Sequence, residues 1–158
     1  MRLLRPALFA AALIGTACRD GTAPDTIVPI TDLPRDLSSS ESKVIASSNE
    51  FAFDLFRTGN VSQHKANVFI SPLSASMALG MTANGANGTT YDQMRSALRQ
   101  NGATREEIGT GYKSLISLLV GLDPGTTFTV ANSIWQRQAF PVNASFLDES
   151  KLYFDAQV

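Results

Sequence analysis

Hydrophobic and polar residues follow one another along most of this chain with the spacing of amphipathic helices. After residue 40, apolar side chains recur three and four positions apart, and turn-forming residues separate the segments that show this pattern. The spacing predicts helices at about 41–58, 72–83, 90–99, 105–122 and 143–154. The segment at 72–83 is rich in Ala, Ser and Gly, so we expect its helix to be closely packed on both sides.

Shorter segments between these helices have the pattern of β-strands. Residues 67–71 form an apolar run that Pro72 ends, and residues 126–135 alternate between the two faces of a strand and contain Thr, Val and Ile. The final residues, 154–158, have the composition of a strand that is beginning. The chain therefore alternates between helix and strand signals.

Polar residues stand where helices begin and can cap their free amides. Ser40 or Ser42 can cap the first helix, with Glu41 near its positive end, and Thr89 or Thr90 can cap the third.

The other helix starts have more specific signals. Ser71 can cap the second helix with Pro72 as its first residue, a position where a missing amide proton costs nothing. Thr104 is followed three residues later by Glu107, which is the pattern of a capping box. Asn143 can cap the last helix. We interpret Asn60, Asn87 and Asn143, which begin Asn-x-Ser/Thr patterns, as cap and turn residues.

The first residues have the pattern of an export signal. Arg2 and Arg5 precede an apolar run at 6–15, and small residues then lead to Cys18. The run is too short to span a bilayer. We predict a signal peptide at 1–17 and lipidation of Cys18, as in bacterial lipoproteins, with an anchor in the membrane. The alternative is an ordinary cleaved signal that leaves a free thiol.

Residues 18–40 carry several prolines and serines and almost no aromatic residue, which predicts a flexible tether. The folded domain is then expected at 41–158.

Composition excludes several classes of function. The 158 residues carry a net charge of −1, with one Cys and one His. This near-neutral balance gives no footprint for nucleic acid, and the single Cys and His exclude a disulfide framework and a zinc or His-rich metal centre. His64, the one candidate base, lies in a polar loop and is predicted to be solvated. We therefore predict no cofactor, no catalytic residues and no enzyme activity.

Residues 67–94 resemble the hallmark segment of the serpins. In that family a short strand leads through Asn-x-Phe-x-Ser-Pro-x-Ser into a buried helix, followed by Gly-Ala-x-Gly-x-Thr and a Gln-Met pair. The matching residues are Asn67, Phe69, Ser71, Pro72, Ser74, Gly85, Ala86, Gly88, Thr89, Gln93 and Met94.

The flanking segments resemble the same family. The predicted helices resemble serpin helices A to E, residues 127–138 resemble strand 2 of the central sheet, and 155–158 resemble the opening of strand 1. The resemblance implies an incomplete α+β serpin fold, with the N-terminal helices, a short sheet B strand and the first strands of central sheet A. It corresponds to less than half of a complete serpin and does not include the reactive-centre loop.

For the longer parent protein, the resemblance implies inhibition of serine or cysteine proteases by insertion of the cleaved reactive loop into the central sheet. The alternative is a non-inhibitory, serpin-like binding or structural module at the cell surface. The helix at 105–122 offers only Arg105 and Lys113 beside two acids, so we do not expect a heparin site.

Ser71 and Ser74 match the family's shutter positions, where hydroxyls at the start of helix B lie beneath the opening strands of the sheet. A buried hydroxyl needs a partner, so hydroxyls that exchange partners when strands separate can act as a latch. The alternative is that Ser71 only caps the helix and that Ser74 only packs as a small residue.

Overall fold

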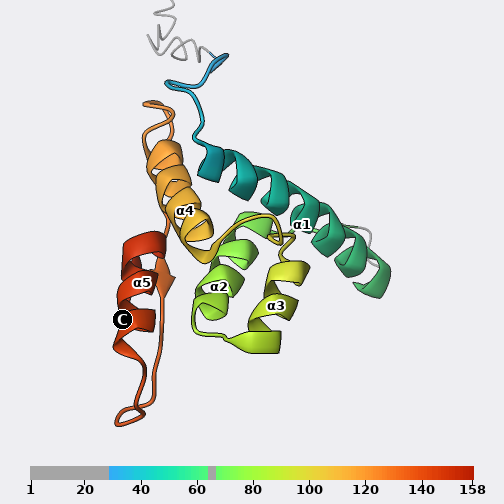
Figure 1. Ribbon diagram of the computed structural model, residues 1–158. Helices are drawn as coiled ribbons and strands as arrows, with labels where there is room; N and C mark the ends of the chain where they lie inside the picture. Colours follow the sequence, from blue (N-terminus) through green and yellow to red (C-terminus); the bar gives the residue numbers. More distant parts are fainter. Residues whose placement is uncertain (1–28, 64–66) are drawn as a thin grey trace, which may run out of the picture.

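The computed structural model describes residues 29–63 and 67–158. The predicted signal peptide at 1–17, Cys18 and His64 lie outside the described residues. The elements, in chain order, are α1 (Ser39–Gln63), α2 (Pro72–Asn84), α3 (Gly88–Ala97), α4 (Arg105–Val120), β1 (Asn132–Ser133), α5 (Ala144–Phe154) and β2 (Ala156–Gln157). Helix α2 packs against α1, α3 and α5, and α4 packs between α1 and α5 (Figure 1).

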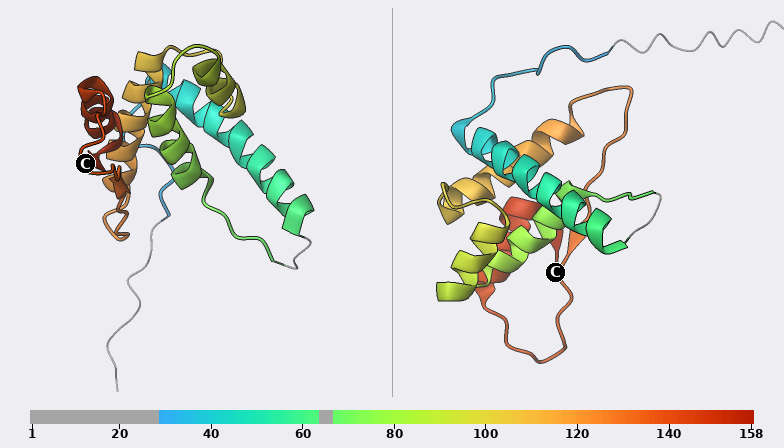
Figure 2. Two further views of the ribbon diagram at one scale, coloured as in Figure 1. Left: turned by 90° about the horizontal axis from the view of Figure 1, so that it is seen from below. Right: turned by 90° about the vertical axis from the view of Figure 1, so that its right-hand side faces the viewer.

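The sheet of the described structure is smaller than the sequence predicts. Strands β1 and β2 pair in parallel, with Asn132 opposite Ala156 and Ser133 opposite Gln157. The predicted strand at 126–135 is therefore wrong outside this short pairing, and the connections on either side of β1 extend away from the helices (Figure 2). A strand needs a partner along its length, and among the described residues only β2 pairs with this segment.

The strand predicted at 67–71 does not form. No part of the described chain pairs with this segment, and the side chain of Phe69 is fully exposed. An apolar run shows that a segment can be a buried strand, but the hydrogen bonds must come from a partner. The strand beginning near the last residues is confirmed as β2.

Local capping signals predict two helix starts and miss two others. Thr104 and Glu107 form the predicted capping box of α4, and Asn143 accepts a hydrogen bond from the Ser145 amide at the start of α5. Helix α3 begins at Gly88, after Asn87, and not at Thr89 or Thr90.

Helix α1 is capped by Ser38, and not by Ser40 or Ser42. The hydroxyl of Ser38 accepts a hydrogen bond from the Glu41 amide at 3.1 Å, and the Glu41 carboxylate accepts one from the Ser38 amide at 2.7 Å. These reciprocal bonds form a capping box. The helix continues through Gly59 and Asn60, where the sequence predicted its end.

The core lies where α2, α4 and α5 meet. Tyr112 of α4 and Phe154 of α5 are fully buried, and their ring centroids lie 5.1 Å apart. Both rings face Gly80 of α2, where an added Cβ would lie 3.3 Å from the Phe154 ring. An added Cβ at Gly111 would lie 2.6 Å from Val44, so this glycine allows α4 to approach α1 closely.

A buried carboxylate joins α1, α4 and the segment that precedes them. The side chain of Glu41 is 0% exposed and accepts hydrogen bonds from both terminal nitrogens of Arg35, at 2.8 and 2.5 Å. It also accepts from the Ser114 hydroxyl of α4 at 2.8 Å. These donors, above all the Arg35 guanidinium, hold the pKa of the Glu41 carboxyl well below its usual range despite its burial.

Replacement of Glu41 tests this network. We expect Glu41→Gln to lower the free energy of unfolding at neutral pH by about 1–3 kcal/mol, because the neutral amide forms no ion pair with Arg35 and has one acceptor oxygen in place of two. The contribution of Glu41 is full above the ordinary pKa of 4.5 and is lost as the pH falls below it, toward the lowered pKa of the folded state. Urea unfolding across this pH range should therefore show a weaker acid dependence in the variant than in the wild type.

The matched control is Glu106→Gln, which removes an exposed carboxylate from the first turn of α4. An equal loss of stability in the two variants would contradict the role assigned to Glu41.

Candidate functional site

The candidate site is the start of α2, where the sequence places Ser71 and Ser74. Ser71 has extended backbone angles, with φ −114° and ψ 91°, and Pro72 occupies the first turn. The Ser71 carbonyl accepts a hydrogen bond from the Ala75 amide at 3.1 Å, so the helix begins here as predicted. Proline is favoured at this position because its ring fixes φ in the helical range.

The structure brings the two predicted hydroxyls together. The Ser71 and Ser74 oxygens lie 2.8 Å apart, within hydrogen-bond distance, and both residues are exposed. The Ser71 side chain makes no capping hydrogen bond to the helix amides, so the prediction that its hydroxyl caps this helix is wrong. In this chain the two hydroxyls are thus bonded to each other and exposed.

Helix α2 has one buried face and one open face. Ser76, Met77, Gly80, Met81 and Ala83 are buried. The prediction that both sides are packed is wrong for this chain, because Ser74, Ala78, Leu79 and Thr82 are exposed. Ala78 and Thr82 of this second face line a cavity that residues of α3 and α5 also border, and none of the four exposed side chains is charged.

The buried face of α2 contacts the sheet through a residue that the sequence did not single out. The side-chain amide of Asn132 on β1 donates a hydrogen bond to the Phe154 carbonyl at 2.7 Å and approaches the Met77 sulfur at 4.0 Å. Asn132 therefore links β1, the end of α5 and α2. The sequence signal for this role was the presence of an amide side chain within a predicted strand, because a half-buried amide needs a hydrogen-bond partner.

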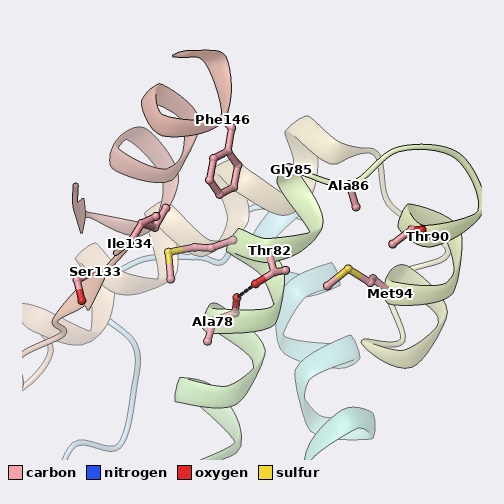
Figure 3. A pocket seen from close by; sticks show the side chains of 10 residues that line it. Ala78, Thr82, Gly85, Ala86, Thr90, Met94, Ser133, Ile134 and Phe146 are labelled. Atoms are coloured by element: carbon pink, nitrogen blue, oxygen red, sulfur yellow. Dashed lines mark hydrogen bonds between the residues drawn. The ribbon is translucent and has the colours of Figure 1, made fainter. Parts of the chain in front are cut away.

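A cavity of about 590 Å³ opens beside α2. Figure 3 shows Phe146 of α5 beside Gly85, Met94 and Thr90 of α3 on the opposite side, and Ser133 of β1 with Ile134, which follows it. The Thr82 hydroxyl donates to the Ala78 carbonyl at 2.9 Å. The lining carries no charged side chain, so it offers packing surface and no acid or base.

The other end of α2 is held by a cation. Arg105 donates hydrogen bonds to the carbonyls of Asn84 at 2.5 Å and Ala86 at 3.0 Å, and its guanidinium lies 4.0 Å from the centre of the Tyr91 ring. A cation at this end is favourable because the last carbonyls of a helix are partly negative. The sequence had assigned no role to Arg105 beyond that of a basic residue on α4.

The buried tyrosine of α4 is a core residue. Burial raises the pKa of Tyr112, whose hydroxyl accepts a hydrogen bond from the Gln100 side chain at 3.1 Å. Within residues 29–63 and 67–158, no group of His, Cys, Asp and Glu is arranged to hold a metal ion. No helix in the same ranges combines the length and apolar character needed to cross a bilayer.

Comparison with known proteins supplies the family. The model of a family described as Serpin (serine protease inhibitor) matches residues 46–158. This chain belongs to the serpin family. Human Serpin I2 is 31% identical over 121 residues, which cover 76% of this chain and 30% of that protein.

The names of other matching serpins refer to different activities. Human corticosteroid-binding globulin is 32% identical over 76% of this chain and 30% of its own length. The leukocyte elastase inhibitor of Bos taurus is 33% identical over 72% of this chain and 29% of its own length. The chain thus spans about 30% of the curated relatives it matches.

Solved structures confirm the partial serpin fold. A crystal structure of cleaved kallistatin complexed with heparin superposes with a TM-score of 0.70 and 23% identity, and the match covers 74% of this chain and 35% of that chain. Glycosylated human kallistatin gives a TM-score of 0.68. At this identity the likeness establishes the fold alone.

Asn132 can be tested for its role in holding β1 against the helices. We expect Asn132→Ala to lower the free energy of unfolding by about 1–3 kcal/mol, because the Phe154 carbonyl loses its donor. Hydrogen exchange at the Ile134 amide, which bonds to the Gln157 carbonyl at 2.9 Å, should become faster.

Ser133→Ala is the control, because Ser133 is exposed and its hydroxyl accepts only from the Trp135 indole. Its effect should stay within about 0.5 kcal/mol. Unchanged exchange at Ile134 in the Asn132 variant would argue against this linking role.

Proposed function

We propose that this chain is the N-terminal part of an exported serpin whose full-length form inhibits serine or cysteine proteases. The observation that carries the proposal is the family match over residues 46–158. The relative named leukocyte elastase inhibitor supports an inhibitory activity. In the proposed mechanism, the target protease cleaves the reactive loop, and the loop inserts into the central sheet while it is still acylated to the enzyme. That loop belongs to the part of the fold that this chain does not match.

In this proposal the start of α2 acts as a latch beneath the sheet. Ser71 and Ser74 bond to each other at 2.8 Å and are exposed on the open face of α2. Each hydroxyl can donate one hydrogen bond and accept others, so the pair can exchange its mutual bond for bonds to a covering strand. Such an exchange supports two arrangements of similar free energy, as a sheet that opens and closes requires.

The test uses the protein that carries a complete serpin domain. We expect it to form an SDS-resistant complex with a trypsin-like or subtilisin-like protease. The double variant Ser71→Ala, Ser74→Ala should change the inhibition rate several-fold, whereas Ser117→Ala, an exposed serine on α4, should not. A double variant with wild-type stability and an unchanged inhibition rate would remove the latch from the proposal.

The second candidate is a non-inhibitory binding module. It is favoured by the relatives named corticosteroid-binding globulin, which match as strongly as the inhibitor does. The absence of any SDS-resistant complex across a panel of proteases would favour this candidate. Small residues in the hinge before the reactive centre would favour loop insertion, whereas proline, bulky or charged residues there would favour the module.

We also propose that residues 1–17 are a signal peptide, that Cys18 carries a lipid anchor, and that the segment after it tethers the serpin domain to a membrane. The basic start, the apolar run and the position of Cys18 support this proposal. Cys18→Ser should move the protein from the membrane fraction to the soluble fraction and abolish incorporation of labelled fatty acid. Mass spectrometry that finds unmodified Cys18 on membrane-extracted wild-type protein would refute the anchor and support an ordinary cleaved signal.

A further inference from the structure

The chain contains three Asn-Gly steps, at Asn84, Asn87 and Asn101. In such a step the backbone nitrogen of the glycine can attack the asparagine side-chain carbonyl carbon. The reaction is fastest before glycine, because no Cβ hinders the attacking nitrogen and the backbone rotates freely. The three steps share the same dipeptide, so differences in their reactivity must come from the fold.

The fold protects Asn84. It is the last residue of α2, and its side-chain nitrogen is buried. The amide of Gly85, which would have to attack, donates a hydrogen bond to the Thr82 carbonyl at 3.1 Å. An attack would therefore break helical backbone geometry and admit water to a buried amide.

The fold also restrains Asn101, although this residue is exposed. It lies in a turn closed by a hydrogen bond from the Ala103 amide to the Gln100 carbonyl at 3.2 Å. The Arg95 guanidinium donates to the carbonyls of Gln100 and Asn101, both at 3.0 Å, and to that of Ala103. Rotation of the backbone at Asn101 would disrupt these contacts.

Asn87 has neither form of protection. It is exposed at the start of α3, and its side chain makes no capping hydrogen bond. Gly88 is the first residue of α3, where the amide has no acceptor within the helix, and it has a φ of 55°. The rotation that brings the Gly88 nitrogen to the Asn87 side chain requires fraying of the first turn only, and helix ends fray readily.

We propose that Asn87 is a site of spontaneous deamidation in the folded protein. The Gly88 nitrogen forms a bond to the side-chain carbonyl carbon of Asn87 and gives up its proton to solvent, and the side-chain amide nitrogen takes up a proton from solvent and leaves as ammonia. Water then opens the resulting five-membered imide at either of its two carbonyls. The products are aspartate and isoaspartate, and no oxidant or reductant is needed.

The two products affect α3 differently. Aspartate places a negative charge at the N-terminus of the helix, where it is favourable. Isoaspartate adds a methylene group to the backbone between Asn87 and Gly88 and so changes the entry of the chain into α3. The Arg105 contact to the Ala86 carbonyl lies beside this position.

The test is peptide mapping by mass spectrometry after incubation of the purified chain at mildly alkaline pH. Asn87 should convert faster than Asn101. It should convert roughly ten-fold faster than Asn84 or more, because each ~1.4 kcal/mol of additional free energy needed to open the structure around Asn84 slows its conversion ten-fold. Labelling by an isoaspartyl methyltransferase should map to the peptide that contains Asn87. The variant Asn87→Asp provides the reference for the aspartate product, and Asn87→Gln should abolish most of the labelling.

The same incubation in concentrated urea separates the effect of the fold from that of the sequence. In the unfolded chain the three steps should convert at similar rates, because they share one dipeptide. Equal rates at Asn84 and Asn87 in native buffer, or faster conversion at Asn101 than at Asn87, would overturn the proposal.

Discussion

The close contact of two aromatic rings with Gly80 is the constraint on which the rest of this structure depends. Tyr112 and Phe154 are fully buried and come from different helices, and both pack where α2 has no side chain. This packing places α4 and α5 against α2. The position of Phe154 in turn fixes the carbonyl that Asn132 binds, so the pairing of β1 with β2 follows from the same contact.

The sequence predicts the helices well because their signals are local. Apolar spacing identifies each helix, and the capping box at Thr104 and the cap at Asn143 involve neighbours in the chain. The start of α1 was misplaced although Ser38 and Glu41 have the same spacing as Thr104 and Glu107. The strand at 67–71 is a different case, because a ladder depends on a partner that no local pattern specifies.

The candidate site was predictable only in part. The positions of Ser71 and Ser74 follow from a short motif, and their spacing of three places the hydroxyls on one helix face. The roles of Asn132 and Arg105 could not be predicted, because each joins segments about twenty or more residues apart in the chain. The sequence indicates that a buried amide or a guanidinium needs hydrogen-bond partners, but which residues serve as partners depends on the fold.

The distribution of charge explains why the open face of α2 suits a covering layer. Helix α2 contains no ionisable residue, and Arg105, the cation at its C-terminal end, is engaged by backbone carbonyls. Covering a charge would cost several kcal/mol, on the order of the net stability of a domain, whereas covering small apolar groups is favourable. The hydroxyls of Ser71 and Ser74 are the polar exception at the start of this face; their mutual bond uses one of the two hydroxyl protons, so a covering layer has to supply an acceptor for the other. A layer placed over this face can therefore bind or leave at little cost in desolvation.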